Sequence, residues 1–429
     1  MPNPRPDPAA PRAATPVAAV TPRQDSTVGP DGGTRSRTRD VCLVCGRPGG
    51  TPVHRLTSVP ASSTVLLATR QEALSIATGE IDLRLCTWCG HLANRAFDQG
   101  LADRAAAFED SQAFSGTFRR YAEDLARRWV ADARAQGGCL VEIGCGRGEF
   151  SRLLVGAGAA RVVALDPTLR LDRVGDDSGG AVEWRAETFG PGSQLPADCR
   201  GVVMRHVLEH VADPVSLLTA VRTALTAGGG PPGRVLVEVP DTWRILHEGA
   251  FWDVYYEHCG YFTGDSLRAL FERCGFRVES VDVVYGAQYV LITARVGDVP
   301  ILEPSHEWVE GLERAATRFT EQVDGAVAHW RGIVGQEVRR GRDVVLWGSG
   351  SKPAGFLAHL AGISGISRVV DINPHKHGHF MPGTGQRIVG PGELVGSAPD
   401  LVVVMNPVYL EEIRLELRGL GIHPGIVAL

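Results

Sequence analysis

Short apolar runs alternate with polar, helix-compatible stretches through the middle of the chain. Five of these runs are rich in valine, leucine and isoleucine, and they occupy residues 139–144, 161–166, 181–186, 201–207 and 234–239. Apolar runs of this length are typical of strands that are buried on both faces of a parallel sheet. Because each run is followed by a helical or loop stretch, the pattern predicts an α/β fold with a doubly wound parallel sheet.

The pattern changes on both sides of these five runs. Residues 276–284 and 287–296 are two adjacent strand-like runs, and a turn at Tyr285 and Gly286 between them predicts an antiparallel hairpin that closes the sheet. Upstream, aromatic and apolar residues at helical spacing predict a helix over residues 105–135.

A second α/β unit is expected near the C-terminus. Apolar residues recur at i, i+4 and i+7 from Trp308 to Val338, which predicts a long amphipathic helix. Three more apolar runs follow it, again interleaved with helical stretches, at residues 343–348, 366–373 and 400–405. Two α/β units in tandem agree with the prior of two or three domains for 429 residues.

The chain therefore divides into four predicted parts. Residues 1–40 carry eight of the 27 prolines and have no apolar period, so they are predicted to be a disordered tail. Residues 41–98 are turn-rich and contain two cysteine pairs, and they are predicted to be a small zinc-binding domain. Residues 99–298 hold the main α/β domain, and residues 299–429 hold the second, Rossmann-like one.

Charge and hydropathy exclude several classes of protein. The chain has 44 Lys and Arg against 49 Asp and Glu, a formal charge of −5, and a mean hydropathy of −0.03. This balance gives no electrostatic reason to expect nucleic acid or an anionic membrane as a partner. No apolar run approaches the roughly 18 to 20 residues of a membrane helix, and the N-terminus lacks a signal-like apolar segment. We expect a cytoplasmic protein.

Two cysteine pairs predict a structural zinc site. Cys42 and Cys45 form one C-x-x-C pair, and Cys86 and Cys89 form another about forty residues later. Each pair can direct two thiolates at one tetrahedral Zn²⁺, and four cysteine ligands leave no open coordination position. Two redox pairs are the alternative. The other five cysteines are dispersed, and we expect core or loop thiols there.

A glycine-rich turn after the first strand of the main sheet predicts a nucleotide-like cofactor. The string Glu142-Ile-Gly144-Cys-Gly146-Arg-Gly148 precedes a helical stretch, and Asp166 ends the next strand. Glycines let the backbone approach a ligand closely, and an acidic residue suits ribose hydroxyls. A bare glycine pattern also fits NAD or a structural turn, but the string resembles motif I of class I S-adenosylmethionine (SAM) methyltransferases.

Further candidates follow the third and fourth strands. Glu187 and Thr188 stand where methyltransferases of this class usually contact adenine, by the same resemblance. His206 ends the fourth strand, on the edge where open α/β sheets bind ligands, and is a candidate catalytic residue that faces the substrate. His210 lies four residues later, and a structural role as a cap or packing residue is the alternative for it.

The segment Tyr255-Tyr256-Glu257-His258 combines a phenol, a carboxylate and an imidazole between the fifth strand and the next helix. Such groups can perform general acid–base chemistry, which makes Tyr255, Glu257 and His258 candidate catalytic residues. A buried aromatic loop with a hydrogen-bonded histidine is the alternative interpretation.

The second α/β unit has its own glycine-rich turn. Gly348, Ser349 and Lys352 follow one strand, and Asp371 ends the next. Backbone N–H groups and an ammonium group can together hold a phosphate or diphosphate, so these four residues are candidate substrate ligands. The turn lacks the spacing of a Walker A loop.

Taken in order, the four cysteines, EIGCGRG, YYEH followed by CGYF, and GSGSK with DINPHKHGHFMPGTGQ resemble the three-part sugar C-methyltransferases of deoxysugar pathways. The resemblance covers residues 41–429. It implies a zinc-binding N-terminal piece, a class I methyltransferase Rossmann-like sheet that binds SAM, and a C-terminal Rossmann-like domain. It also implies a nucleotide-linked 4-keto-deoxysugar as substrate, methylated on the carbon next to the ketone. The turn WGSGSKPAG departs from the family's usual sequence at this position.

The chemistry of such a reaction assigns roles to the candidates. A base, His258 or Tyr255, removes the proton next to the ketone, and the enolate then attacks the methyl group of SAM. Glu257 is expected to orient the histidine, and His206 or a backbone group faces the enolate oxygen. The alternatives are an O- or N-methyltransferase acting on a hydroxyl or amine, and a non-enzymatic scaffold that binds zinc and a nucleotide.

Overall fold

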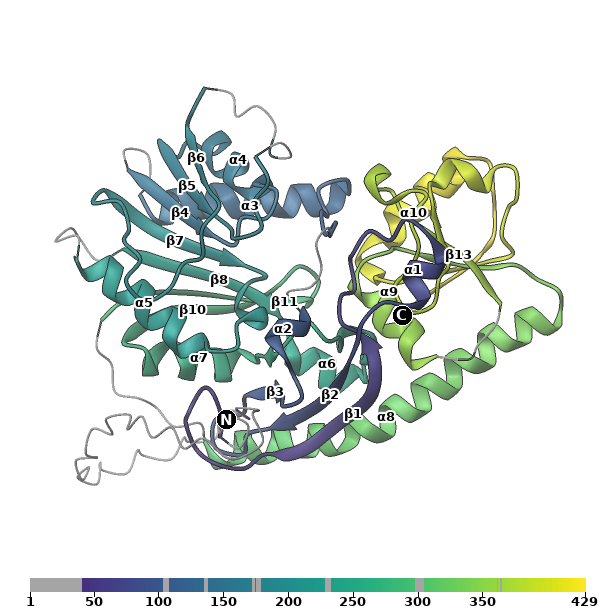
Figure 1. Cartoon of the computed structure of the whole chain (residues 1–429), viewed down its shortest axis with the longest axis horizontal. Helices are drawn as coiled ribbons and strands as arrows, with labels where there is room; N and C mark the ends of the chain where they lie inside the picture. The colour runs from purple at the N-terminus through teal and green to yellow at the C-terminus, as the bar shows by residue number, and fades with distance from the viewer. Residues whose placement is uncertain are drawn as a thin grey trace, which may run out of the picture. The chain divides into compact units, whose positions relative to one another are not determined.

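The computed structural model describes residues 41–102, 108–134, 138–171, 174, 179–227, 233–297, 305–360, 362 and 365–429. The tail predicted to be disordered, residues 1–40, lies outside the described residues. Three sheets of four, seven and five strands organise the described part of the chain (Figure 1). No helix in the described ranges is long and apolar enough to cross a membrane.

The seven-stranded sheet has the order β10-β11-β8-β7-β4-β5-β6. Its five parallel strands coincide with the five apolar runs, and they are β4 (Cys139–Ile143), β5 (Arg161–Leu165), β6 (Val182–Arg185), β7 (Cys199–Arg205) and β8 (Arg234–Pro240). The predicted hairpin is β10 (Phe276–Val284) and β11 (Tyr289–Val296), and β11 is inserted antiparallel between β8 and β10. The prediction of a doubly wound sheet closed by a hairpin is confirmed.

Helices cover both faces of this sheet. Successive strand residues point to opposite sides, so neighbouring residues of one strand enter different cores. On one face, α3 (Gly116–Asp132) and α4 (Glu149–Gly156) share a core with Leu140 of β4. On the other face, α5 (Pro214–Ala227) and α7 (Gly264–Arg273) share a core with the neighbouring Val141 (Figure 1). The short helices between β7 and α7 are η3 (Leu208–His210), α6 (Thr242–Glu248) and η4 (Phe251–Asp253).

The helix predicted over residues 105–135 is wrong at its start. Helix α3 begins after Ser115, whose hydroxyl accepts the N–H of Phe118 at 3.2 Å and so caps the first turn. Phe108, which the helical spacing included, instead forms an isolated β-bridge with Val65. Residues 105–107 and 135 lie outside the described residues.

The turn-rich segment near the N-terminus contains a sheet that the sequence analysis did not predict. Its order is β1-β2-β3-β9, with β1 (Thr51–Pro60), β2 (Thr78–Leu85) and β3 (Leu92–Asn94) from this segment, together with α1 (Arg70–Leu74) and α2 (Gln99–Ala102). The last strand, β9 (Gly260–Tyr261), begins one residue after the YYEH segment and pairs with β3 through Leu92 and Tyr261. The N-terminal sheet therefore includes a strand from the main domain.

The second α/β unit follows α8 (His306–Arg339), the long helix that was predicted. Its sheet is parallel, with the order β14-β13-β12-β15-β16. Its elements are β12 (Val344–Trp347), α9 (Ser351–His359), β13 (Ile366–Val370), η5 (Pro374–Lys376), β14 (Arg387–Val389), η6 (Pro391–Leu394), β15 (Leu401–Val404), η7 (Pro407–Tyr409), α10 (Leu410–Gly419) and β16 (Gly425–Ala428). The predicted Rossmann-like unit is confirmed, and β14 and β16 were not predicted.

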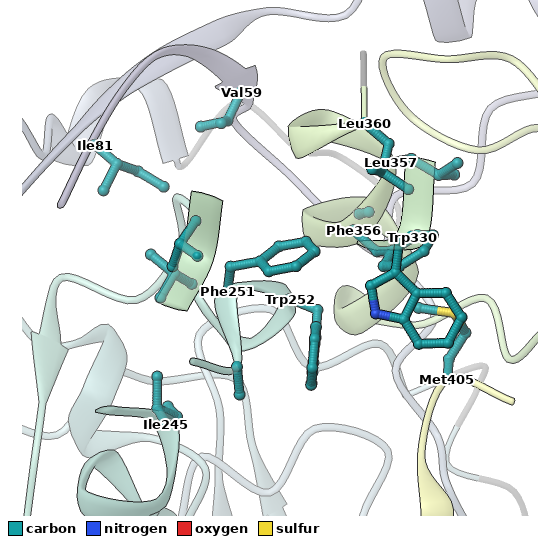
Figure 2. Close-up of a cluster of buried hydrophobic side chains, with 14 of the residues drawn as sticks. Val59, Ile81, Ile245, Phe251, Trp252, Trp330, Phe356, Leu357, Leu360 and Met405 are labelled. Carbon is teal, nitrogen blue, oxygen red and sulfur yellow. The ribbon is translucent and has the colours of Figure 1, made fainter. Parts of the chain in front are cut away.

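A buried apolar cluster connects elements of the four-stranded and five-stranded sheets with the segment between β8 and β9 (Figure 2). Phe251 of η4 stacks on Phe356 of α9 with ring centroids 6.0 Å apart. A Cβ on Gly355 would lie 2.9 Å from the backbone oxygen of Trp252, so only glycine permits this approach of α9 to η4. The same cluster includes Val59 of β1. The segment just before the YYEH residues is therefore packed between β1 and α9.

Candidate active site

The turn between β4 and α4 has the backbone geometry that a nucleotide-like ligand needs. Gly144, Gly146 and Gly148 have φ angles of 75°, 52° and 70°, which glycine adopts without strain. The N–H of Gly146 donates to Oδ2 of Asp166 at 2.9 Å, and a Cβ on Gly146 would meet nothing within 4 Å. The turn therefore presents open backbone next to the acid that ends β5.

Two acidic side chains support this turn. Glu142 is 3% exposed, accepts a hydrogen bond from Ser151, and has its pKa raised to about 7 by burial. Asp166 uses its Oδ1 to accept the N–H and the hydroxyl of Thr168 at 2.8 and 2.6 Å. The structure thus brings together the residues that the sequence singled out for SAM.

The stretch after β6 lies next to the same turn. A Cβ on Gly148 would collide with the Trp184 ring at 2.1 Å, so β6 packs directly on the glycine turn. Glu187 and Thr188 follow Trp184 and are exposed. They occupy the edge of the sheet at which the resemblance places adenine.

His206 lies at the carboxyl end of β7, between two buried carboxylates. Its Nε2 is 3.1 Å from Glu238 and its Nδ1 is 3.5 Å from Glu209. Arg205, at 2.8 Å, and the Tyr121 hydroxyl also bind Glu238. Burial opposes a charge on His206, but the two carboxylates outweigh burial and raise its pKa to about 9. Because each ring nitrogen of this imidazolium lies within 3.5 Å of a protein carboxylate, His206 is suited to holding the site together by charge.

The backbone at His206 also connects this network to the glycine turn. His206 has φ of 54°, which is uncommon for a residue other than glycine and is often found at functional sites. A Cβ on Gly144 would lie 2.2 Å from a methyl group of Val207. The segment after β7 is therefore in direct contact with the turn that would hold the cofactor.

Glu209, His210 and His258 form a compact polar cluster beside this network. One polar atom from each lies within 4.8 Å of the others, and the two imidazole rings are 4.8 Å apart. Glu209 is 1% exposed, and among the described residues neither of its oxygens has a hydrogen-bond donor. The sequence analysis did not name Glu209. The spacing His206-x-x-Glu209-His210 was a sequence signal that could have identified it. The short helix η3 places Glu209 and His210 of this string close to His258.

The YYEH segment places a phenol against an imidazole. The rings of Tyr255 and His258 are 4.2 Å apart, and His258 is 3% exposed. Burial lowers the pKa of His258 well below the usual histidine value, and burial raises the pKa of Tyr255 well above the usual tyrosine value. At neutral pH a proton acceptor and a hydrogen-bond donor therefore lie side by side.

The two residues between them have other partners. The Glu257 carboxylate accepts hydrogen bonds from Ser63, and its backbone oxygen is 2.9 Å from Nδ1 of His210. No hydrogen bond within the described part of the chain joins its side chain to the neighbouring histidine that it was expected to orient. Tyr256 is 1% exposed and its hydroxyl accepts the N–H of Asp98 at 2.8 Å, which makes it a structural residue.

The turn between β12 and α9 repeats the geometry of the first glycine turn. The N–H of Gly348 donates to the backbone oxygen of Val370 at 2.7 Å, and φ of Gly348 is 109°. Ser349 donates its N–H and its hydroxyl to Asp371 at 2.8 and 2.5 Å. A backbone N–H of this turn therefore donates to Asp371, just as the N–H of Gly146 donates to Asp166 in the first turn.

Lys352 has a protein partner across the fold. Its ammonium forms an ion pair with Asp253 of η4, which also binds Arg244. Burial opposes ionisation of Asp253, but the two cations outweigh burial and hold its pKa below the usual range. The residue that the sequence assigned to a diphosphate thus reaches the segment that leads into the YYEH residues.

The four cysteines predicted to bind zinc converge. The Sγ atoms of Cys42 and Cys89 are 3.5 Å apart, as are those of Cys45 and Cys86, and all four lie within 4.8 Å of one another. Four thiolates around one Zn²⁺ with Zn–S bonds of about 2.3 Å would be separated by ~3.8 Å. The donor set and its spacing therefore fit the ion. The other five cysteines are also free, as expected, and they are Cys139, Cys145, Cys199, Cys259 and Cys274.

Comparison with known proteins agrees with this architecture. Residues 114–281 match the family described as "Methyltransferase domain", and residues 305–423 match "C-methyltransferase C-terminal domain". C-methyltransferase NovU of Streptomyces niveus is 26% identical over 402 residues, which cover 88% of this chain and 92% of NovU. The chain therefore belongs to the multidomain C-methyltransferase family. It is a SAM-dependent methyltransferase with a class I methyltransferase sheet.

Two further similar proteins cover a smaller share of the chain. A ubiquinone biosynthesis O-methyltransferase of Cereibacter sphaeroides is 31% identical over 169 residues, covering 36% of this chain and 67% of that protein. Among solved structures, a 1,6-didemethyltoxoflavin-N1-methyltransferase of Burkholderia thailandensis is 20% identical, covers 41% of this chain and 79% of its own, and has a TM-score of 0.34.

Proposed function

We propose that this enzyme methylates the carbon next to the ketone of a nucleotide-linked 4-keto-deoxysugar. Membership of the C-methyltransferase family supports methyl transfer to carbon. The observation that carries the proposal is the pair of Tyr255 and His258, with rings 4.2 Å apart. A neutral imidazole beside a protonated phenol supplies what enolate formation needs, a base for the carbon-bound proton and a donor for the developing oxyanion.

The charge states favour one assignment of these two roles. Because burial keeps Tyr255 protonated, its hydroxyl is the donor to the ketone oxygen. Because burial keeps His258 neutral, its imidazole is the base. Each ring nitrogen of His206 lies within 3.5 Å of a carboxylate of Glu209 or Glu238, so we assign His206 the part of a fixed positive charge near the enolate.

The cofactor would be held by the first glycine turn. We assign Glu142, the three glycines and Asp166 to SAM, with Asp166 on the ribose hydroxyls and Glu187 and Thr188 near the adenine. When bound, SAM supplies the electrophilic methyl group. The contact between Gly144 and Val207 supports this placement, since it sets the turn beside the segment that carries His206.

The second glycine turn is assigned to the nucleotide of the substrate. Open α/β sheets bind ligands at the carboxyl ends of their strands, which is where Gly348 and Ser349 lie. Their backbone geometry, which repeats that of the cofactor turn, supports the assignment. Asp371 shapes this turn by accepting the Ser349 N–H.

We also propose that the four converging cysteines bind one Zn²⁺. The coordination set is complete with four thiolates, so the ion would be structural. One cysteine pair lies just before β1 and the other directly after β2, so a shared ion would tie together two segments that are 41 residues apart in sequence. Metal binding would therefore contribute directly to folding of this part of the chain.

The test of the reaction is exchange of the proton next to the ketone. With S-adenosylhomocysteine in place of SAM, the bound keto-sugar should exchange this proton with solvent deuterium. Exchange should fall by about 10² to 10⁴ in His258→Ala, the usual contribution of a positioned base, and less in Tyr255→Phe. His423→Ala, at an exposed position, is the control.

The same assay separates carbon from oxygen or nitrogen methylation. An enzyme that methylates a hydroxyl or amine has no reason to exchange a carbon-bound proton. If authentic 4-keto substrates show neither exchange nor a new C-methyl group while a hydroxyl or amine acceptor is methylated, the proposed reaction is wrong.

A further inference from the structure

The side chain of Glu257 is held by the segment that follows β1 of the N-terminal sheet. The segment that follows β1 donates three hydrogen bonds to its carboxylate, from the Ser62 hydroxyl at 3.1 Å, the Ser63 N–H at 2.9 Å and the Ser63 hydroxyl at 2.5 Å. Both serines are buried, with 6% and 3% exposed. Since a carboxylate has about four acceptor sites, this segment occupies most of them.

Ser63 also contacts the second α/β unit. Its Oγ is 2.8 Å from Oγ of Ser351, the first residue of α9. A hydroxyl has one proton to donate. The Ser63 hydroxyl is placed to donate to both Oε2 of Glu257 and Oγ of Ser351, so these two acceptors share its single proton. The Ser63 hydroxyl is thus the centre of a hydroxyl chain that links Ser351 of α9 to Glu257 of the candidate catalytic segment.

The position of Glu257 determines the positions of both histidines. Its backbone oxygen is 2.9 Å from Nδ1 of His210, and the next residue is His258. The other end of the segment is fixed by the ion pair between Lys352, also in the first turn of α9, and Asp253. The first turn of α9 therefore holds the candidate catalytic segment at both ends.

We propose that Ser63 and Ser351 are positioning residues that set the candidate base through Glu257. Neither serine touches the reacting atoms, and their hydroxyl chain fixes the backbone that carries His258. The N-terminal sheet and α9 therefore contribute to the rate of the reaction as well as to stability. This inference rests on the proposed role of His258 in the methyl transfer.

Steady-state kinetics of the full chain with a 4-keto-sugar nucleotide test the hydroxyl chain. Ser63→Ala should lower kcat roughly 10-fold or more, as expected for one lost hydrogen bond to a charged group. Ser351→Ala should lower kcat less, because Ser63 still donates to Glu257, and Ser351→Thr should restore the rate. The affinity for SAM should not change. Ser58→Ala, at an exposed position of β1, is the matched control.

A double variant distinguishes positioning from general destabilisation. If Ser63 acts through Glu257, adding Ser63→Ala to Glu257→Gln should cost much less than Ser63→Ala alone, because residues in one network are not additive. Additive losses, or a loss in Ser63→Ala that Ser58→Ala reproduces, would overturn the proposal. If Ser63→Ala folds poorly, Ser351→Ala, at a half-buried position, can be combined with Glu257→Gln for the same comparison.

Amide hydrogen exchange separates failure of this inference from failure of the proposed reaction. Residues 253–260 should exchange faster in Ser63→Ala and in Ser351→Ala than in the wild type or in Ser58→Ala, whatever the methyl acceptor is. Unchanged exchange in both variants would overturn the hydroxyl chain. If the two variants exchange faster as expected but the wild type does not methylate the keto-sugar, only the proposed substrate is overturned.

Discussion

Replacing His206 by glutamine removes a positive charge from between two buried carboxylates. In the wild type, 28% of the His206 side chain is exposed, its Nε2 is 3.1 Å from Glu238, and its Nδ1 is 3.5 Å from Glu209. Glutamine keeps a polar group of similar length but cannot carry the charge. We predict that the variant loses a contribution to folding stability that depends on pH.

The magnitude and sign follow from the pKa of His206. Raising that pKa from 6.5 to about 9 corresponds to about 3 kcal/mol of stabilisation of the folded state. Because the folded-state pKa is the higher one, this stabilisation is fully present below pH 6.5, where both states bind the proton. It decreases as the pH rises towards 9 and is lost above 9.

Two measurements check this prediction. In protein labelled with ¹³C at histidine Cε1, the resonance that disappears in His206→Gln should titrate with a midpoint near pH 9. Between pH 6.5 and 9.5, the free energy of unfolding in urea should fall by about 3 kcal/mol more in the wild type than in His206→Gln. His423→Gln, at an exposed position, is the control. A His206 midpoint near 6.5, or equal pH dependence in wild type and variant, would refute the reasoning.

Further predictions address the metal, the cofactor turn and Lys352. Cys86→Ser should lower the zinc content and destabilise the N-terminal sheet; metal analysis that finds no zinc in the wild type would contradict the site. Asp166→Ala should weaken SAM binding by about 1.5 to 3 kcal/mol in calorimetry, and unchanged affinity would reject its assignment. Lys352→Met and Asp253→Asn should each lower stability by about 3 kcal/mol or less, because breaking a buried pair leaves one partner uncompensated. A rise in acceptor KM confined to Lys352→Met would instead indicate binding to the diphosphate.

The main sheet was predictable because its strands are buried on both faces. Each of β4, β5, β7 and β8 reads as a continuous apolar run, and the turn between β10 and β11 stands where Tyr285 and Gly286 predicted it. The strand β1 gives no such signal. Only Val53 and Val59 are buried in it, and two register shifts interrupt its alternation. A period-two pattern that is broken in this way cannot be recognised without the partner strand.

The start of α3 illustrates a different failure. The aromatic residues Phe108 and Phe114 continue the helical spacing of the residues after them, and the spacing alone gives no reason to end the helix. In the structure the helix begins only after Ser115, which caps its N-terminus and also donates its hydroxyl to Glu412 at 2.8 Å. A local serine signal was present in the sequence, but its partner in α10 was not visible there.

The candidate site was predictable wherever one local motif carries it, and unpredictable wherever distant segments meet. The cofactor turn and the YYEH residues are contiguous in sequence and were named. Glu257 is 194 residues from Ser63 and Lys352 is 99 residues from Asp253, so the spacing of residues along the sequence could not predict either contact. The expected roles of Glu257 and Lys352 came from residue type alone, and residue type does not determine which partner a charge finds in the fold.

The two glycine turns differ in a way that bears on what each can bind. Asp166 and Asp371 both accept an N–H from their own turn, but Asp371 is 8% exposed and lies 3.7 Å from the Lys376 ammonium. Each acid also accepts the N–H of the residue two positions later, Thr168 or Asn373, at 2.8 Å, so the difference lies in burial and in the Lys376 contact. An acid that binds ribose hydroxyls must be reachable and hold its charge for the ligand, a condition that the half-buried Asp166 meets better. Because the N–H groups of Gly348 and Ser349 donate to Val370 and Asp371, the second turn should contact a nucleotide through the backbone beyond Ser349, with Asp371 keeping the turn in place.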